Sequence, residues 1–375
     1  MLVEMLGVQL PGASFVSPDS PLREALTRAA VEKLILSTQA AGTYRPLYDV
    51  ITEYSMVNAV VGLLATGGST NNTLHLVAMA RAAGIELTWE DMDELSRATP
   101  LLARIYPNGE GDVNQFHAAG GMSYLVHELR RGGLLNENVV NIMGQGLDAY
   151  EKAPSLDEKG NAVWLEPVTQ SSDASILRGV DGPFDAEGGL RLLKGNLGQG
   201  VIKISAVAPE YRVVEEECIV FDDQDDLIAA FKRGELNRNF VAVVRFQGPR
   251  ANGMPELHKM TPPLGLLQDR GYKVALVTDG RMSGASGKVP SAIHLSPEAL
   301  SGGILTRVRT GDRVRLDANT GTIEVLVSAE ELAARTPVTQ PLRAQDLGRN
   351  LFGGFRSLAD LASEGGSVFN SCIDF

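Results

Sequence analysis

Hydrophobic and polar residues recur with two different periods along the chain, and the period changes between residues 150 and 190. Before this region apolar residues recur at helical spacing, as in the stretches LREALTRAAVEKLILSTQAA and TLHLVAMARAAG. After it the pattern consists of short runs rich in Val and Ile, bounded by Gly and Asp turns. The first part is therefore predicted to be largely helical and the second part to be rich in strands.

Local signals predict where several helices begin. Ser20 stands before Pro21, the pattern of an N-cap followed by proline at the first helical position. Thr88 is the expected cap of another helix. Asp112, Asn114 and His117 are expected to precede an amphipathic helix that ends at Gly132. Residues 135–150 are predicted to form one more helix, and the proline-containing residues 152–190 an irregular linker.

The strand-rich part extends over residues 190–335 and is followed by a helical tail. Helices are expected within it at residues 223–233 and 263–270, and the turn in DANTGTIEV predicts a hairpin. The predicted strands lie in LRLLKGNLGQGVIKISAV, RVVEEECIVF, FVAVVRFQG, KVALVTDG and RVRTGDRVRLDANTGTIEVLV.

Composition excludes several classes of protein. The chain has 375 residues, of which 44% are hydrophobic and 21% charged, so it is not disordered. The net charge of -12 argues against nucleic-acid binding, because no basic patch offsets it. No apolar run reaches the ~18 residues that cross a bilayer, and residues 1–11 lack the basic start of a signal peptide. Cys218 and Cys372 match no metal spacing and suit a reducing compartment, so a cytoplasmic protein is expected.

Three polar, Gly-rich turns are candidates for binding an anion. Two of them, GPRANGMPELHK and DGRMSGASGK, lie on either side of a predicted helix and a buried strand. The third, TGGSTNN, places Ser69, Thr70 and Asn71 before a helix, where they would suit a carboxylate or phosphate or would simply cap the helix.

Four stretches together resemble the IlvD/Edd dehydratases: GGSTNNTLHLVAMARAAG, YPNGEGDVNQFHAAGG, GPRANGMPELHK and VTDGRMSGASGKVPSAIHLSPEA. The resemblance extends over residues 1–375 and is interrupted only around 152–185. It implies an α/β protein with the remainder of an N-terminal α/β(α) domain over residues 1–175. A C-terminal β-rich, barrel-like β/β/α domain with a helical tail would then cover residues 176–375.

The resemblance also implies an activity, that of a hydro-lyase. The expected reaction is dehydration of 6-phospho-D-gluconate to 2-dehydro-3-deoxy-6-phosphogluconate, a step of the Entner–Doudoroff pathway. Ser283 would act as the base in its alkoxide form, Glu256 would bind a divalent metal, Mg²⁺ by its preference for oxygen ligands, and an iron–sulfur cluster would take the leaving hydroxyl. The alternatives are a related sugar-acid or dihydroxy-acid dehydratase and a truncated protein without activity. From the residues alone Ser283 is an ordinary turn residue and Glu256 an exposed helix-start glutamate.

Substrate contacts are expected from the same three turns. Ser286 matches a hydroxyl that contacts substrate in the family, and the 69–71 turn is expected near it. Positive charge marks candidates for the substrate phosphate, of which two or three are expected to touch it while the others form surface ion pairs. These candidates are Arg281, Lys288, His258, Lys259 and Arg250.

Family members are longer and carry upstream the cysteines that hold the cluster. Neither cysteine of this chain lies in such a motif, so the cluster ligands are expected in a missing N-terminal region. The chain is therefore predicted to be a fragment or truncated form that is inactive alone. The complete protein is expected to be a homodimer with a small phosphorylated sugar acid as substrate, and with neither membrane nor nucleic acid as partner.

Overall fold

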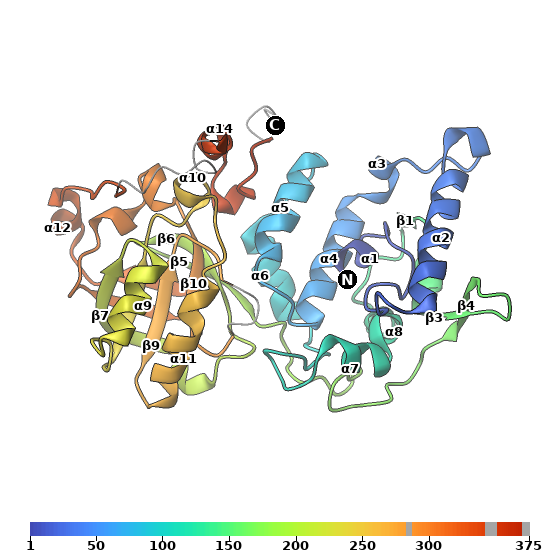
Figure 1. Ribbon diagram of the computed structural model, residues 1–375, viewed down its shortest axis with the longest axis horizontal. Helices are drawn as coiled ribbons and strands as arrows, with labels where there is room; N and C mark the ends of the chain where they lie inside the picture. The colour runs from blue at the N-terminus through green and yellow to red at the C-terminus, as the bar shows by residue number, and fades with distance from the viewer. Residues whose placement is uncertain (283–286, 342–350, 370–375) are drawn as a thin grey trace. The chain divides into compact units, whose positions relative to one another are not determined.

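The computed structural model describes residues 1–282, 287–341 and 351–369, and it divides the chain into two compact units (Figure 1). Residues 1–68 and 94–189 form the first unit, and residues 69–93 and 190–375 form the second. The predicted division between residues 175 and 176 follows the family's domain plan and stays a prediction. Packing groups the chain differently, because the segment 69–93 belongs with the strand-rich unit.

The first unit is mainly helical, as predicted. Helix α4 is buried along almost its whole length because its sequence is apolar on nearly every side. At Gly62 the helix α1 comes so close that a Cβ would lie 2.7 Å from Met5 Cγ. The helices that lie wholly in this unit are α1 (Leu2–Met5), α2 (Pro21–Leu36), α3 (Leu47–Val50), α4 (Glu53–Ala65), α7 (Val113–Ala118) and α8 (Gly121–Arg131), with short 3₁₀ turns η1 (Gln39–Ala41) and η2 (Asp148–Glu151).

The predicted helix starts at Ser20 and Thr88 are confirmed. Ser20 Oγ accepts from Arg23 N at 3.2 Å at the start of α2. Thr88 Oγ1 accepts from Asp91 N at 3.1 Å, directly before α6 (Trp89–Ala98). Both residues satisfy a backbone N–H that the first turn of a helix leaves without a partner.

Two local predictions in the first unit were wrong. Residues 135–150 form a small hairpin of β1 (Val140–Asn141) and β2 (Gly144–Gln145) instead of a helix, because Gly144 and Gly146 take positive φ angles of 146° and 78°. The expected linker 152–190 contains a second hairpin, β3 (Lys152–Leu156) with β4 (Ala162–Pro167). The predicted helix that ends at Gly132 is confirmed as α8, which follows Asp112, Asn114 and His117. The short helix α7, which Asp112 caps and which contains Asn114 and His117, was not predicted.

The second unit is built around a closed eight-stranded barrel, which confirms the predicted fold class. Around the barrel the strands follow the order β10-β6-β5-β12-β11-β7-β8-β9. Apolar side chains from these strands form one buried cluster that includes Val243, Val277 and Leu316. The strands are β5 (Leu190–Gly195), β6 (Gly198–Lys203), β7 (Val213–Phe221), β8 (Phe240–Val244), β9 (Val274–Thr278), β10 (Ser291–Ser296), β11 (Arg313–Asp317) and β12 (Thr322–Val325).

Four neighbouring strands of the barrel, β7 to β10, are parallel. The crossovers between them carry α9 (Gln224–Lys232) and α11 (Thr261–Asp269), which pack against β7 and β9 (Figure 1). Ligands of such α/β arrangements bind where the parallel strands end. Two of the predicted polar turns follow strands at this edge, the first after β8 and the second after β9.

The remaining elements of the second unit surround the barrel. Strand β10 was not predicted, because SAIHLS is short and holds two serines and a histidine. Helix α5 (Asn72–Ala82) contacts η7 (Ala362–Glu364), which in turn contacts β10. The other helices described here are α10 (Pro249–Asn252), α12 (Ala329–Ala334) and α14 (Gly353–Leu358), with 3₁₀ turns η3 (Pro209–Tyr211), η4 (His258–Met260), η5 (Ala299–Ser301) and η6 (Ile304–Arg307). None of the helices that the structure describes is long and apolar enough to cross a membrane.

Candidate active site

Two loops come together where the parallel strands of the barrel end. We name residues 245–257 the first site loop and residues 279–290, of which 279–282 and 287–290 are described, the second site loop. Glu256 forms a parallel β-bridge with Arg281, and Leu257 N donates to Arg281 O at 3.0 Å. Gly280 permits this approach, because a Cβ there would lie 2.6 Å from Gln247 Cβ. The backbone thus fixes Glu256 beside the second site loop.

Glu256 joins these loops to the third predicted turn. Asn71 Nδ2 donates to Glu256 Oε1 at 2.6 Å across 185 residues of sequence. Arg281 Nε donates to Met254 O at 2.7 Å, which holds the guanidinium over the first site loop. Three of the predicted site residues, Asn71, Glu256 and Arg281, are therefore brought together within the second unit.

The 69–71 turn contributes side chains to the candidate site, whereas its backbone N–H groups already donate hydrogen bonds within the turn. Asn71 N donates to Ser69 Oγ at 3.3 Å, Asn72 N to Ser69 O at 3.0 Å, and Thr73 N to Thr70 O at 3.0 Å. These bonds engage the N–H groups that an anion at the helix start would need. Thr70 is buried, and Asn71 directs its carboxamide to Glu256.

The predicted cations Lys259 and Lys288 lie in surface ion pairs. Lys259 Nζ is 3.2 Å from Asp225 Oδ1 of α9, and Lys288 Nζ is 2.6 Å from Asp269 Oδ1 of α11. Both partners belong to helices on the outside of the barrel. His258 is exposed at the start of η4. The structure therefore does not place these three residues in contact with Glu256.

The remaining predicted residues have other positions. Ser283 and Ser286 lie outside the residues that the structure describes, so their predicted roles stay predictions. Arg250 N donates to Glu298 Oε1 at 2.8 Å, and Arg250 Nε donates to Ala359 O at 2.6 Å, which ties its side chain to the C-terminal segment.

Asp279, at the end of β9, holds the backbone of three segments together. Its carboxylate is fully buried and accepts from Phe246 N (3.2 Å), Gln247 N (2.9 Å) and Ala299 N (2.9 Å). Burial is the main cause that raises the pKa of Asp279 to about 7. Sequence reasoning noted Asp279 in its turn but gave it no role. The signal was an aspartate that directly follows the strand VALVT and precedes a glycine.

Strain is concentrated at the same edge. Among the residues that the structure describes, the non-glycine residues with positive φ are Phe246 (62°), Met254 (48°) and His294 (60°). All three lie in the second unit, two of them in the first site loop and one on β10. Such conformations persist only where the surroundings impose them, and they cluster at functional sites.

His294 was not predicted as a site residue, and it is completely buried. Burial, with smaller effects from Arg281 and His75, lowers the pKa of His294 to about 3. The ring is therefore neutral at physiological pH. A lone histidine on an apolar strand gives no sequence signal that distinguishes it from a core residue.

Comparison with known proteins places this geometry in a family. The description "Dihydroxy-acid/6-phosphogluconate dehydratase C-terminal" matches residues 175–366, more than half of the chain, and its N-terminal counterpart matches residues 1–150. The chain belongs to this dehydratase family. The resemblance seen in the sequence is thereby confirmed.

Proteins named phosphogluconate dehydratase and one named dihydroxy-acid dehydratase are similar to the chain. The chain is 57% identical over 375 residues to phosphogluconate dehydratase of Pseudomonas aeruginosa and 51% identical over 377 residues to that of Escherichia coli, covering 100% of this chain and 62% of each relative. It is 37% identical over 354 residues to dihydroxy-acid dehydratase of Nitratidesulfovibrio vulgaris, covering 91% of this chain and 60% of that protein. The chain thus spans about three-fifths of the length of these relatives.

The described residues of this family member do not fit an iron–sulfur cluster. Cys218 lies in the barrel core, its Sγ is 3.2 Å from Arg309 O, and burial raises the pKa of its thiol to about 12. A cluster is held by several cysteine thiolates grouped in space. Cys372 lies outside the described residues.

The residues around Glu256 could supply some, but not all, of the ligands of a hard divalent cation. Asn71 Oδ1 is buried and has no donor among the described residues, and it belongs to the side chain that binds Glu256. Carboxylate and amide oxygens are the ligands that Mg²⁺ accepts, usually together with water or substrate oxygens. The described part of the chain contains no group of three or more His, Cys, Asp or Glu side chains arranged for a metal. Glu256 and Asn71 would therefore supply only part of the coordination.

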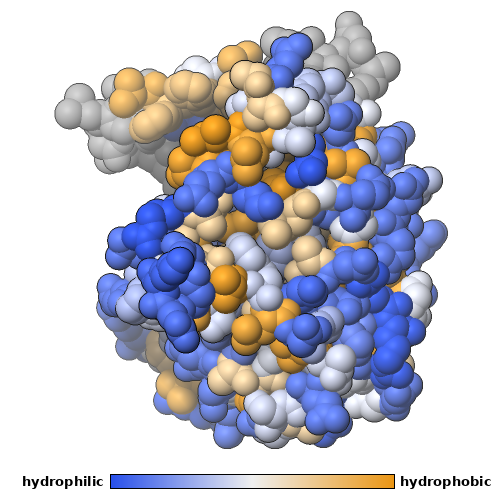
Figure 2. All heavy atoms as spheres, turned by 90° about the vertical axis from the view of Figure 1, so that its right-hand side faces the viewer, coloured by the Kyte–Doolittle hydropathy of each residue, from blue (hydrophilic) through white to orange (hydrophobic). Residues whose placement is uncertain are grey.

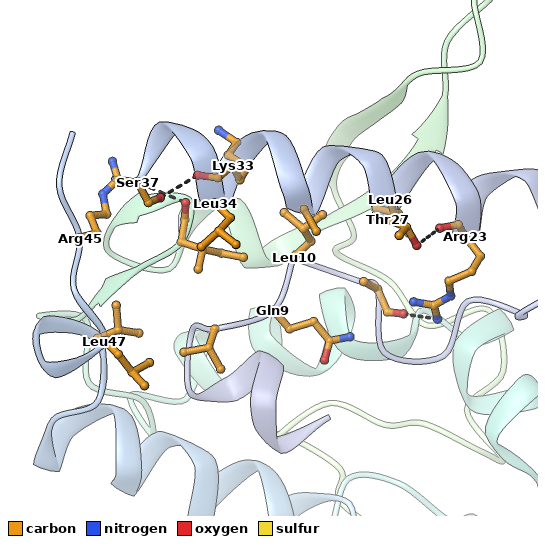
Figure 3. A pocket seen from close by; sticks show the side chains of 15 residues that line it. Gln9, Leu10, Arg23, Leu26, Thr27, Lys33, Leu34, Ser37, Arg45 and Leu47 are labelled. Atoms are coloured by element: carbon orange, nitrogen blue, oxygen red, sulfur yellow. Dashed lines mark hydrogen bonds between the residues drawn. The ribbon is translucent and has the colours of Figure 1, made fainter. Parts of the chain in front are cut away.

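A separate cavity of about 540 Å³ lies in the first unit under α2, and we name it the α2 cavity (Figure 3). Its wall is mainly apolar, with Leu10, Leu26 and Leu34 among its residues. Arg23 Nη2 donates to Ala13 O and Val16 O, and Arg45 Nη1 donates to Ile142 O, so both guanidinium groups are engaged by backbone. Figure 2 shows apolar patches interrupting the polar surface on this side of the molecule. The α2 cavity offers volume without grouped reactive side chains.

Proposed function

We propose that this chain takes part in the dehydration of 6-phosphogluconate to 2-dehydro-3-deoxy-6-phosphogluconate. The contact among Asn71, Glu256 and Arg281 is the observation that carries the proposal, because it joins all three predicted turns at the edge of the barrel. Relatives named phosphogluconate dehydratase, 51% and 57% identical, support the substrate. The whole activity stays part of the proposal, because the chain spans about three-fifths of their length.

The reaction breaks two bonds on adjacent carbons. The C2–H bond gives its proton to a base and its electron pair to carbon, and the C3–O bond breaks with loss of hydroxide, which leaves as water. The resulting enol becomes the 2-keto acid by moving a proton from oxygen to C3. A C–H bond beside a carboxylate is a weak acid, so catalysis must stabilise the negative charge that develops there.

The chain's own residues have distinct parts in this proposal. Glu256, held by Asn71, would keep a divalent cation at the site, and that cation would neutralise charge on the substrate carboxylate when bound. Arg281, fixed by Met254 O, would bind an anionic group of the substrate. Ser283 would be the base, as the family resemblance implies. We derive no step through an iron–sulfur cluster, since the described residues do not hold one.

The phosphate is the least supported part of the substrate. Lys259 and Lys288 are paired with Asp225 and Asp269, but exposed ion pairs contribute only about 0–1 kcal/mol and can exchange partners. An unphosphorylated sugar acid or a dihydroxy acid is the second candidate, because a dihydroxy-acid dehydratase is 37% identical. A homodimer, which the resemblance implies, and a cytoplasmic location, which the two cysteines favour, belong to the same proposal.

The experiment is a direct assay of the purified chain for 2-keto acid formation, with Mg²⁺ and with and without iron–sulfur reconstitution. 6-Phosphogluconate, gluconate and a 2,3-dihydroxy acid are compared at equal concentration. Preference for 6-phosphogluconate supports the proposal, and equal or faster turnover of the others supports the second candidate. Turnover of none of the three substrates under any of these conditions would contradict the proposal.

Substrate binding tests the site at Glu256 independently of turnover. Isothermal titration with 6-phosphogluconate and Mg²⁺ is run on the wild-type chain and on Glu256→Gln, which keeps the size of the side chain but removes its charge. Weaker binding in the variant supports a site at Glu256. Equal binding in both proteins, or none in either, would contradict it.

A further inference from the structure

His294 contacts both sides of the candidate site. Its backbone N–H donates to Gly280 O at 2.9 Å, directly before Arg281. Its ring Nδ1 lies 3.4 Å from Thr73 Oγ1, in the first turn of α5, and the ring lies against Trp89 with 6.1 Å between centroids. One buried residue therefore connects the second site loop to the helix that follows Asn71.

Hydrogen bonds around Thr73 decide which ring nitrogen carries the proton. The single hydroxyl proton of Thr73 is donated to Thr70 O at 2.8 Å. Thr73 Oγ1 can then only accept from His294, so Nδ1 must carry the hydrogen. A neutral imidazole has one such hydrogen, and Nε2 is accordingly a bare acceptor. Among the described residues Nε2 has no donor, which agrees with this assignment.

A residue chosen for packing alone would be different. His294 holds a left-handed backbone conformation, with φ of 60°, that is uncommon for residues other than glycine. Its Nε2 is buried and has no hydrogen-bond partner among the described residues. An apolar side chain at this position would avoid the cost of burying a polar atom without a hydrogen bond. Both features are unfavourable, and both are explained if the Nδ1–H bond to Thr73 is needed at this position.

Three successive contacts connect His294 to Glu256, the proposed metal ligand. Nδ1–H fixes the Thr73 hydroxyl, and the Thr73 hydroxyl fixes the Thr70 carbonyl. Asn71 follows Thr70 directly and donates to Glu256 at 2.6 Å. The same histidine fixes the carbonyl of Gly280, which precedes Arg281.

We propose that His294 is a positioning residue of the dehydratase site, whose Nδ1–H and backbone N–H set the distance between the Asn71–Glu256 pair and Arg281. The importance of this link for catalysis rests on the proposed function. The link itself is a property of the folded second unit and can be measured without turnover.

The first experiment observes the ring in the intact 375-residue chain. The chain is labelled with ¹⁵N-histidine, and the His294 signals are assigned by their loss in His294→Asn. We expect a neutral ring with its proton on Nδ1 between pH 5 and 8, whereas free histidine favours the proton on Nε2. In Thr73→Val the acceptor is removed at nearly constant volume, so the proton should move to Nε2, and Thr73→Ser should restore it to Nδ1. A wild-type ring protonated on Nε2, or one that is unchanged in Thr73→Val, would overturn the proposal.

The second experiment tests positioning. The side-chain amide resonance of Asn71 reports its bond to Glu256, and we expect it to shift in Thr73→Val and His294→Phe but to return in Thr73→Ser. Under the assay conditions that give turnover of 6-phosphogluconate, Thr73→Val and His294→Phe should each lower kcat/KM at least tenfold. The double variant should lower kcat/KM no further than either single variant. If the Asn71 resonance does not shift and the two variants lower kcat/KM independently, His294 does not position the site, even if the protein is a working dehydratase. Absence of turnover in the wild type, with both spectroscopic results intact, would refute only the proposed function.

Discussion

The barrel edge and the α2 cavity differ in the properties by which active sites are usually sought. The α2 cavity has about 540 Å³ of space but an apolar wall, and its arginines Arg23 and Arg45 donate to backbone carbonyls. The barrel edge combines strained backbone, a buried neutral histidine and an Asn–Glu pair. Family membership and chemistry both favour the barrel edge. In this molecule grouped polar side chains, and not volume, indicate where the reaction would occur.

The largest expected effect is on the carboxylate that holds the barrel edge together. Asp279→Asn replaces one oxygen by an NH₂ group, which then faces at least one of the three N–H donors of Phe246, Gln247 and Ala299. A buried donor without an acceptor costs about 1–3 kcal/mol, so we expect the second unit to lose at least that free energy of unfolding. Urea unfolding followed by fluorescence measures it, and an unchanged midpoint would show that the carboxylate does not hold these loops.

The pH dependence of the same variant isolates the titration of Asp279. Because its pKa is raised to about 7 in the folded protein, the folded state keeps a proton that the unfolded state loses near its ordinary value. The stability from this group is therefore present at low pH and is lost as the pH rises through 7, by about 2–3 kcal/mol between pH 5 and 8. His294 is present in both proteins, so the difference between the two profiles reports Asp279 together with its neighbour Glu298, whose charge also raises the pKa of Asp279. Equal pH profiles for wild type and Asp279→Asn would contradict the raised pKa.

The second effect is catalytic. Glu256→Gln keeps a side-chain oxygen for Asn71 but removes the charge that would hold a divalent cation. Under the assay conditions that give turnover of 6-phosphogluconate, we expect kcat/KM to fall by roughly 100-fold or more. Loss of one preorganised electrostatic group produces effects of this size. Far-UV circular dichroism checks that the fold is kept. A loss below threefold would mean that the Asn71–Glu256 pair is only structural.

A smaller effect is expected for the cations on the outer surface. If Lys288 exchanges Asp269 for the substrate phosphate, Lys288→Gln should raise KM for 6-phosphogluconate about fivefold, in keeping with the small energies of exposed ion pairs, and should leave turnover of gluconate unchanged. Lys259→Gln is the parallel test, and Lys33→Gln in the α2 cavity is the matched control. If all three variants behave alike, none of these lysines recognises the phosphate.

The sequence predicted the fold better than it predicted the site, for physical reasons. Periodicity and capping signals identified the helices α2, α5, α6, α8, α9 and α11, and periodicity identified most barrel strands. It was wrong for residues 135–150, where the apolar residues of VVNIM mimic a helix but Gly144 and Gly146 turn the chain back. Family motifs pointed to Asn71 and Glu256, and positive charge pointed to Arg281. The fold brings these three residues together. His294 could not be found this way, because its importance depends on a contact with Thr73 that is 221 residues away in sequence.

The smallest expected effect tests the α2 cavity itself. Leu34 lines the cavity and is 68% exposed, so Leu34→Ser removes little buried apolar area. We expect the free energy of unfolding to change by no more than about 0.5 kcal/mol, as for most surface substitutions, and kcat/KM for 6-phosphogluconate to stay within twofold of wild type. Chemical unfolding and the keto-acid assay measure the two quantities. Because Leu34 lies in the first unit and outside every contact of the Asn71–Glu256 pair, a change in kcat/KM above threefold would mean that apolar volume under α2 contributes to the reaction, and the distinction between the two regions would fail.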